Sequence, residues 1–436
     1  MVEPIVIPRS EHALSRRDID PDALKVLYRL KDANYVAYLV GGSVRDLLLG
    51  RQPKDFDVGT SAHPYQVKRL FRNCWIIGRR FRLAHVKFGQ KIIEVATFRR
   101  QVSAVADEPG EMEADGGERD LLIHRDNTFG TPEEDAFRRD FTINALFYDI
   151  ATFSIIDYVG GLEDLKERVV RSIGDPAERF QEDPVRMLRA IALAARLDFT
   201  IDPPVAGAIR SHGAAIARSA PARLVEEYYK ILRAGAAERT FRWLAEVGLL
   251  GWITPELQRG CSPELWESLA RLDAYRRRFG PERLTNAILL GSLLVPLGFS
   301  PRMFHVRDAP AAAGRPGHAS ATLEAHLPAM REPGRLTLGV LPMPRREIER
   351  LRQVLVLQPR LFEATNSPRA IGSVMSRSAF GEALAWLEIH GGAPDAAAHW
   401  RALHQARGAE TGEAGRAGFH PRRRRRRRSR RTGPPR

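Results

Sequence analysis

The chain has 436 residues, 44% of them hydrophobic, which is enough for the cores of about two to four domains. The formal net charge is +15, but the eleven arginines of residues 416–436 supply +11 of it, which leaves +4 for the other 415 residues. The apolar runs are shorter than the ~18–20 residues that a bilayer span needs, and the first residues show no export signal. The two cysteines form no CxxC pair. We expect a cytoplasmic protein with a polyanionic partner and no membrane span.

The first third of the chain alternates between helix and strand patterns. Asp20 and Pro21 predict an N-cap and a first helical residue, because proline is tolerated at the start of a helix. Apolar runs predict strands at 35–40, 75–77, 83–88, 91–98, 141–150 and 154–159. Gly89 and Gln90 predict a hairpin turn. Residues 101–127 are acidic, rich in glycine and aperiodic, so we expect a mobile loop there.

From about residue 162 onward the pattern is helical. Amphipathic stretches predict helices at 183–197, 222–234, 263–277, 344–357 and 379–390, and residues 309–319 read as a loop. From residue 406 small and basic residues dominate, and such a composition cannot form a core. The expected fold class is α+β. We expect four segments: a head (1–161), a helical neck (162–235), a helical body (236–405) and a disordered tail (406–436).

The first chemical signal is a double glycine between a strand that ends at Val40 and a helix that begins at Val44. Glycines let a backbone come close to a ligand, and the amides at a helix N-terminus suit phosphate oxygens. Arg45 adds a cation near them. A strand-glycine-helix turn by itself is commonly only a tight turn.

The second signal is the pair Asp55 and Asp57. Residues two apart in a strand face the same side, so two carboxylates would lie together and repel each other unless a cation bridges them. Mg²⁺ commonly binds one or two carboxylates together with substrate phosphates, and two such ions can clamp an in-line phosphoryl transfer. The alternative is a solvated turn. The glycine turn upstream favours the magnesium interpretation.

A third carboxylate is expected on a neighbouring strand, and there are two candidates. Asp140 stands at the head of the apolar run 141–150, and Glu94 interrupts the apolar run 91–98, where an unpaired carboxylate would be costly. Either side chain could instead pair with a nearby arginine. We favour Asp140 and place Glu94 second.

The third signal lies at the start of the predicted helix 183–197. Asp183 can cap this helix with Pro184 at its first position, and Arg186 and Arg189 follow at spacings of three, so they can share one face. An arginine donor and an aspartate acceptor match the N1 and N6 groups of adenine. Cytosine offers the same order of donor and acceptor, so this pair cannot separate A from C. The alternative is a well-capped helix with a solvated basic face.

Four segments in this order, LVGGSVRD, KDFDVGT, RRDFTINAL and EDPVRMLRA, resemble the class II nucleotidyltransferases, which comprise bacterial poly(A) polymerases and tRNA CCA-adding enzymes. The resemblance implies a polymerase-β-like palm followed by helical neck, body and tail regions. It implies that Asp55 and Asp57 bind two Mg²⁺ ions and that Asp140 lies near the catalytic centre. The residues implied to bind the ATP substrate are Gly41, Gly42, Ser43, Arg45, Arg139, Asp183, Arg186 and Arg189.

Within this family, the stretch 77–86 and the arginine-rich end resemble bacterial poly(A) polymerases. The implied activity is the addition of AMP from ATP to RNA 3′ ends. We interpret His85 as a structural or RNA-contacting residue, because activation by a metal removes the need for a general base. The alternative is a tRNA CCA-adding enzyme. A second alternative, from another class, is a non-catalytic RNA-binding protein. That alternative would leave Asp55 and Asp57 without a role.

The tail is predicted to tether RNA electrostatically, without sequence preference, because no aromatic residue interrupts its arginine run. The alternative is a solubilising or protein-docking tail. The sequence does not indicate a particular protein partner. The arginines concerned are Arg422, Arg423, Arg424, Arg425, Arg426, Arg427, Arg428, Arg430 and Arg431.

Overall fold

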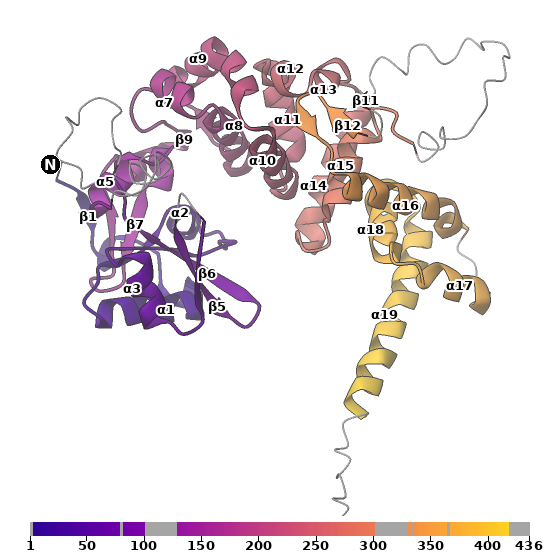
Figure 1. The fold of residues 1–436 in the computed structure, drawn as a ribbon, viewed down its shortest axis with the longest axis horizontal. Helices are drawn as coiled ribbons and strands as arrows, with labels where there is room; N and C mark the ends of the chain where they lie inside the picture. The colour runs from indigo at the N-terminus through magenta and orange to yellow at the C-terminus, as the bar shows by residue number, and fades with distance from the viewer. Residues whose placement is uncertain are drawn as a thin grey trace, which may run out of the picture. The chain divides into compact units, whose positions relative to one another are not determined.

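The structure is a computed structural model that describes residues 3–78, 82–100, 129–300, 330–332, 335–363 and 367–417 (Figure 1). The contacts divide the chain into two compact units. The first comprises residues 1–261 with 337–342, and the second comprises residues 262–336 with 343–436. Within the described residues no helix is both long and apolar enough to cross a membrane.

A mixed sheet of eight strands forms the base of the first unit, in the order β1-β8-β7-β2-β3-β6-β5-β4. Only β3 and β6 run parallel, and every other neighbouring pair in this sheet is antiparallel. The strands are β1 (Ile5–Ile7), β2 (Ala37–Val40), β3 (Asp57–Thr60), β4 (Cys74–Ile77), β5 (Leu83–Phe88), β6 (Lys91–Thr97), β7 (Leu146–Asp149) and β8 (Ser154–Asp157).

Helices cover one face of this sheet. α1 packs against β2, β3 and β6, and α3 packs against β4, β5 and β6 (Figure 1). α1 begins where the sequence predicts it, because the Asp20 carboxylate accepts hydrogen bonds from the backbone of Asp22 and Ala23. The helices of the head are α1 (Pro21–Asp32), α2 (Gly42–Leu48), α3 (Pro64–Leu70), α5 (Pro132–Phe137) and α6 (Gly161–Glu167).

The prediction of a strand at 141–150 is wrong for the first half of that range. Residues 142–144 form a 3-10 turn, and β7 begins only at Leu146. Asp140 explains the difference, because its Oδ1 accepts hydrogen bonds from the backbone N–H of Phe141 (2.9 Å) and from Nδ2 of Asn144 (3.2 Å). Such local bonds compete with pairing in a sheet. The other predicted strands and the turn at Gly89 are confirmed.

The rest of the first unit is helical, with short strands added. α8 is amphipathic and buries its apolar face, including Met187, Leu188 and Ile191. The helices of this part of the first unit are α7 (Pro176–Glu182), α8 (Val185–Leu197), α9 (Pro203–His212), α10 (Pro221–Arg233), α11 (Ala237–Glu246), α12 (Leu249–Ile253) and α13 (Pro255–Arg259). β9 (Val169–Val170) pairs with β10 (Thr200–Ile201), and the end of β12 (Arg335–Leu338) pairs with β13 (Leu341–Pro342), so the neck and body are not purely helical.

The second unit is a helical assembly around buried side chains such as Leu351, Trp386 and Trp400. α15 and α18 both pack against α16. Its helices are α14 (Pro263–Phe279), α15 (Asn286–Leu294), α16 (Arg345–Phe362), α17 (Pro368–Met375), α18 (Phe380–His390) and α19 (Pro394–Ala417), and the short strand β11 (Met330–Glu332) pairs with the start of β12. α19 continues past residue 406, where the sequence suggests that a tail without structure begins. The loops predicted at 101–127 and 309–319 and the arginine run 422–431 lie outside the described residues. The four-segment division stays a prediction.

Candidate active site

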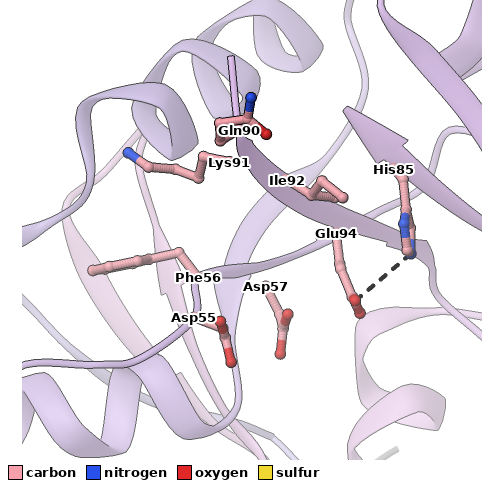
Figure 2. A pocket seen from close by; sticks show the side chains of 8 residues that line it. All are labelled: Asp55, Phe56, Asp57, His85, Gln90, Lys91, Ile92 and Glu94. Atoms are coloured by element: carbon pink, nitrogen blue, oxygen red, sulfur yellow. Dashed lines mark ion pairs between the residues drawn. The ribbon is translucent and has the colours of Figure 1, made fainter. Parts of the chain in front are cut away.

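The predicted carboxylates Asp55 and Asp57 lie in one pocket of about 490 Å³ on the sheet of the head. Asp57 is the first residue of β3, and Asp55 precedes the strand with a side chain that is 69% exposed, 3.3 Å from Nζ of Lys54. Glu94 of β6 and His85 of β5 line the same pocket. Figure 2 shows the ends of the three carboxylates turned to the same side, with Phe56 and Lys91 pointing away. The pocket therefore gathers three acidic groups: Glu94 on β6, Asp57 at the start of β3, and Asp55 two residues before that strand.

The electrostatics of the pocket act most strongly on Asp57. Partial withdrawal of its carboxylate from water, followed by the charges of Glu94 and Asp55, raises the pKa of Asp57 to about 6, and Arg139 opposes this shift. The residue as a whole keeps an exposed surface. A carboxylate whose neighbours resist its ionisation is stabilised in its charged form by a cation.

His85 faces Glu94 across the paired strands β5 and β6, because the two residues are partners in the register. Nε2 of His85 lies 3.6 Å from Oε1 of Glu94 (Figure 2). The His85 side chain is 17% exposed and that of Glu94 is 50% exposed. His85 thus borders a carboxylate of the pocket, a position that its place in the apolar run 83–88 does not reveal.

Asp140, which the sequence favours as the third carboxylate, lies elsewhere. It is buried, it does not line the pocket, and its Oδ2 forms an ion pair of 2.7 Å with Nη2 of Arg189 on α8. The structure therefore places Glu94, the second candidate, beside Asp55 and Asp57. The preference for Asp140 assumes a strand where the 3-10 turn stands, and a catalytic role for Asp140 stays a prediction.

The backbone requires glycine at the first position of the pair, and the second lies close to an arginine side chain. Gly41 has φ of +72°, and a Cβ there would lie 2.8 Å from Nη1 of Arg139. At Gly42 a Cβ would lie 3.3 Å from Nη2 of Arg45. These glycines let two arginines approach the turn closely.

The arginines at the turn are held by protein partners. Arg45 is 3% exposed, and its guanidinium donates to Asp46 (2.8 Å) and to Oδ1 of Asn144. Ser43 is also buried and donates to the carbonyl oxygen of Val40. Arg45 is thus buried and stabilises the turn, whereas the sequence suggests an arginine whose guanidinium is accessible to a phosphate.

The charge of Arg139 acts on the carboxylate pocket, where it opposes the rise in the pKa of Asp57. Its guanidinium donates to Oδ2 of Asp135 (2.9 and 3.2 Å) and to the carbonyl oxygen of Asn144 (3.1 Å). Asp135 is buried and was missed in the sequence. Its spacing of three and four residues from Arg138 and Arg139 is the signal that could have found it.

The three predicted base-reading residues follow one another at the start of α8. Asp183 precedes the helix, where its Oδ1 accepts from the backbone N–H of Val185 (3.3 Å) and its Oδ2 accepts from Arg223 (2.8 Å). Arg186 donates to Glu182 and to the carbonyl oxygen of Arg179, both at 3.0 Å. Each of the three side chains has a partner within the protein.

Two further arginines, both missed in the sequence, join the neck to the head. Arg179 is 6% exposed, and its Nη2 donates to the carbonyl oxygens of Arg138 (2.8 Å) and Arg139 (2.7 Å). Burial lowers the pKa of Arg179. Arg51 donates to the carbonyl oxygens of Arg196 and Leu197, at the end of α8, both at 3.1 Å. No sequence pattern predicts such contacts, because they depend on the tertiary structure.

Three family models match the chain. "Poly A polymerase head domain" matches residues 37–171, "Probable RNA and SrmB- binding site of polymerase A" matches residues 198–261, and "Polymerase A arginine-rich C-terminus" matches residues 319–432. Together they account for more than half of the sequence.

Among curated relatives, poly(A) polymerase I of Salmonella typhi is 54% identical over 254 residues, which are 58% of this chain and 54% of the relative. A CCA-adding enzyme of Lactobacillus helveticus is 38% identical over 215 residues, 49% of this chain and 50% of the relative. The matched part thus spans about half the length of these relatives.

Among solved structures, the Bacillus stearothermophilus CCA-adding enzyme in complex with CTP is similar, with a TM-score of 0.58 and 26% identity. This similarity covers 89% of this chain and 82% of that one. An apo tRNA-processing enzyme (TM-score 0.54, 21% identity) shares the fold. The glycine turn, the carboxylate pocket, the matched segments and the shared fold agree, and the chain belongs to the class II nucleotidyltransferase family of poly(A) polymerases and CCA-adding enzymes.

Proposed function

We propose that this protein transfers AMP from ATP to the 3′ ends of RNA. The 3′ hydroxyl oxygen attacks the α-phosphorus, the bond to the pyrophosphate oxygen breaks, pyrophosphate leaves and the hydroxyl proton passes to solvent. The observation that carries this proposal is the pocket in which Asp55, Asp57 and Glu94 meet and the pKa of Asp57 is raised. The 54% identity to a poly(A) polymerase, against 38% to a CCA-adding enzyme, supports ATP as the nucleotide.

The donor set suits Mg²⁺, since carboxylate oxygens are the ligands that this ion prefers. The described residues hold no group of three or more His, Cys, Asp or Glu close enough together to enclose a metal ion. We therefore assign two ions to Asp55 and Asp57 together with phosphate oxygens of the nucleotide. When bound, such ions activate the hydroxyl and neutralise charge on the triphosphate.

Glu94 takes the place of the third carboxylate in this proposal. It comes from the strand beside β3 and lines the same pocket as Asp55 and Asp57, whereas Asp140 pairs with Arg189. Asp140 then acts as a positioning residue. Its bond to Arg189 ties the turn before β7 to the start of α8.

The nucleotide is proposed to bind between the glycine turn and the start of α8. Gly41 and Gly42 allow close approach, and Arg139 is the cation of the turn that lies near the carboxylates. Asp183 and Arg186 are proposed to read the base, with Arg189 assisting. Arg45 and Ser43 support the turn, since their polar atoms are buried and bonded within it.

RNA is the proposed second substrate. The matched RNA-binding model at residues 198–261 supports contacts along α9 to α13. The match at residues 319–432 is consistent with an arginine tail that attracts phosphates. The tail's role as a tether stays a prediction.

The test supplies ATP or CTP separately, with either generic RNA or a tRNA that lacks its CCA end. Repeated addition of AMP to generic RNA, with little use of CTP, is the expected result. Addition limited to CTP and then ATP on the truncated tRNA would instead identify a CCA-adding enzyme. RNA binding without any nucleotide transfer would favour the non-catalytic alternative.

A further inference from the structure

The open face of the outer strands carries exposed apolar side chains beside the carboxylate pocket. Trp75 (53% exposed) and Ile77 (51%) lie two residues apart on β4, so they share a face, and Ile92 (49%) lies on β6 next to Glu94. Helices α1 and α3 cover the opposite face. Single exposed hydrophobic residues need no explanation, but three on one face of one small sheet region form a patch.

The register places this patch in line with the carboxylates. Trp75 pairs with His85, and His85 pairs with Glu94, so the three form one row across β4, β5 and β6. Neighbouring strands lie about 4.8 Å apart, so Trp75 stands about 10 Å from Glu94 along this row. Ile92 itself lines the carboxylate pocket (Figure 2). The apolar patch and the pocket are therefore one continuous surface.

A cation completes this surface. Lys87 lies two residues beyond His85 on β5, so it shares the open face, and it pairs in register with Ile92. It is exposed. An aromatic ring, flat apolar groups and a cation side by side are the components of sites that bind single-stranded nucleic acids, where rings stack on bases and cations meet phosphates.

We propose that Trp75, with Ile77 and Ile92, is a stacking platform for the last bases of the RNA substrate, and that Lys87 contacts their phosphates. The proposal rests on the proposed function, because the 3′ hydroxyl must reach the carboxylate pocket and its neighbouring nucleotides must then lie nearby. Stacking tolerates any base, which suits an enzyme that extends different RNA ends and then its own product. RNA is thus the occupant that the position of the patch favours over a protein partner.

The first test measures binding and turnover with a six-nucleotide oligoadenylate. Trp75→Ala should weaken RNA binding and raise the KM for RNA by about 5- to 150-fold, the range that loss of one stacking ring produces. The KM for ATP and the kcat at saturating RNA should stay as in the wild type. Trp75→Phe should recover most of the loss, because a ring is restored. The matched control is Tyr65→Ala, since Tyr65 is 57% exposed on α3, over the opposite face of the same sheet.

The second test removes the bases instead of the ring. An RNA with two abasic nucleotides at its 3′ end should bind the wild type as weakly as the Trp75→Ala variant binds intact RNA. The affinity for this abasic RNA should be the same in the Trp75→Ala variant as in the wild type. If the variant and the abasic RNA each weakened binding and the two losses of binding free energy added when the two were combined, the ring and the base would not touch. That result would refute the platform.

Both tests separate this inference from the proposed function. A wild type that binds RNA and transfers no AMP would refute the function, and the fluorescence-anisotropy binding measurements would still test the platform. An active enzyme in which Trp75→Ala binds RNA as tightly as Tyr65→Ala does would refute the platform alone. The patch would then serve another occupant.

Discussion

The carboxylate of Asp140 and the guanidinium of Arg189 meet at 2.7 Å, and this ion pair links the 3-10 turn before β7 to helix α8. Glu94, by contrast, shares its pocket with Asp55 and Asp57. Because the two acids occupy different surroundings, their amide variants should fail in different ways.

Glu94→Gln should lower kcat by at least about 100-fold and weaken Mn²⁺ binding, measured directly by electron paramagnetic resonance, because a negative charge is lost beside the proposed metal ligand Asp57. Asp140→Asn should leave Mn²⁺ binding intact and raise the KM for ATP instead, because Arg189 loses its partner. If Asp140→Asn abolished metal binding while Glu94→Gln retained it, the assignment would have to be reversed.

Asp55→Ala and Asp57→Ala should each lower turnover by several orders of magnitude, because each removes a proposed metal ligand. RNA binding, followed by fluorescence anisotropy, should survive in both variants. Gln52→Ala is a suitable neighbour control, since Gln52 is exposed and lies three residues before Asp55. Near-normal AMP incorporation by Asp55→Ala would contradict the metal assignment.

Arg186→Ala should relax the choice of base. Each hydrogen bond lost to a base edge is worth ~1–3 kcal/mol, which corresponds to about a 5- to 150-fold loss of discrimination. The measurement compares kcat/KM for ATP, GTP and UTP. Arg223→Ala tests the partner of Asp183, because it frees that carboxylate without removing it. An Arg186→Ala enzyme with the wild-type preference for ATP would place base reading elsewhere.

The raised pKa of Asp57 predicts a pH-dependent stability. In the metal-free protein the folded-state pKa of about 6 exceeds the ordinary 3.8, so between these values the folded state binds more protons than the unfolded state. Stability should therefore fall as the pH rises from about 4 to 6. Asp57→Asn should raise the free energy of unfolding in a chelator at pH 7.5 by about 1 kcal/mol, less than the full shift implies because water screens this carboxylate. The gain should vanish at pH 4, and a gain that persists there would have another cause.

His390 in the second unit should show the opposite sign. Burial, followed by the charge of Arg271, lowers the pKa of His390 to about 3, and its Nε2 lies 3.0 Å from Oγ of Ser292. The unfolded state then binds the extra proton first, so stability should be lost as the pH falls from about 6.5 toward 3. His390→Gln should reduce this loss by roughly 3 kcal/mol between pH 6.5 and 4 in urea unfolding. His404→Gln, at an exposed position on α19, is the matched control.

The sequence predicted the features that depend on short-range geometry. The glycine turn, the Asp20 cap and the spacing of Asp183 and Arg186 follow from local backbone rules, and they hold. The place of Glu94 beside Asp57, by contrast, depends on how β6 aligns with β3. The inward turn of Arg45 depends on Asn144, almost a hundred residues away. Such contacts are set by tertiary packing, which no local pattern encodes.

The contacts between the head and the helices that follow it have a consequence for fidelity. Arg179 fixes α7 to the backbone around Arg139, Arg189 pairs with Asp140, and Arg51 holds the end of α8. A polymerase that copies a strand takes its instructions from a complementary base held by stacking. In the proposed function the start of α8 takes the place of that templating base, so the accuracy of the enzyme would depend on how little α8 can shift. Loosening the attachment made by Arg179 or by Arg51 should therefore make the enzyme misincorporate, even though neither residue is proposed to touch the base.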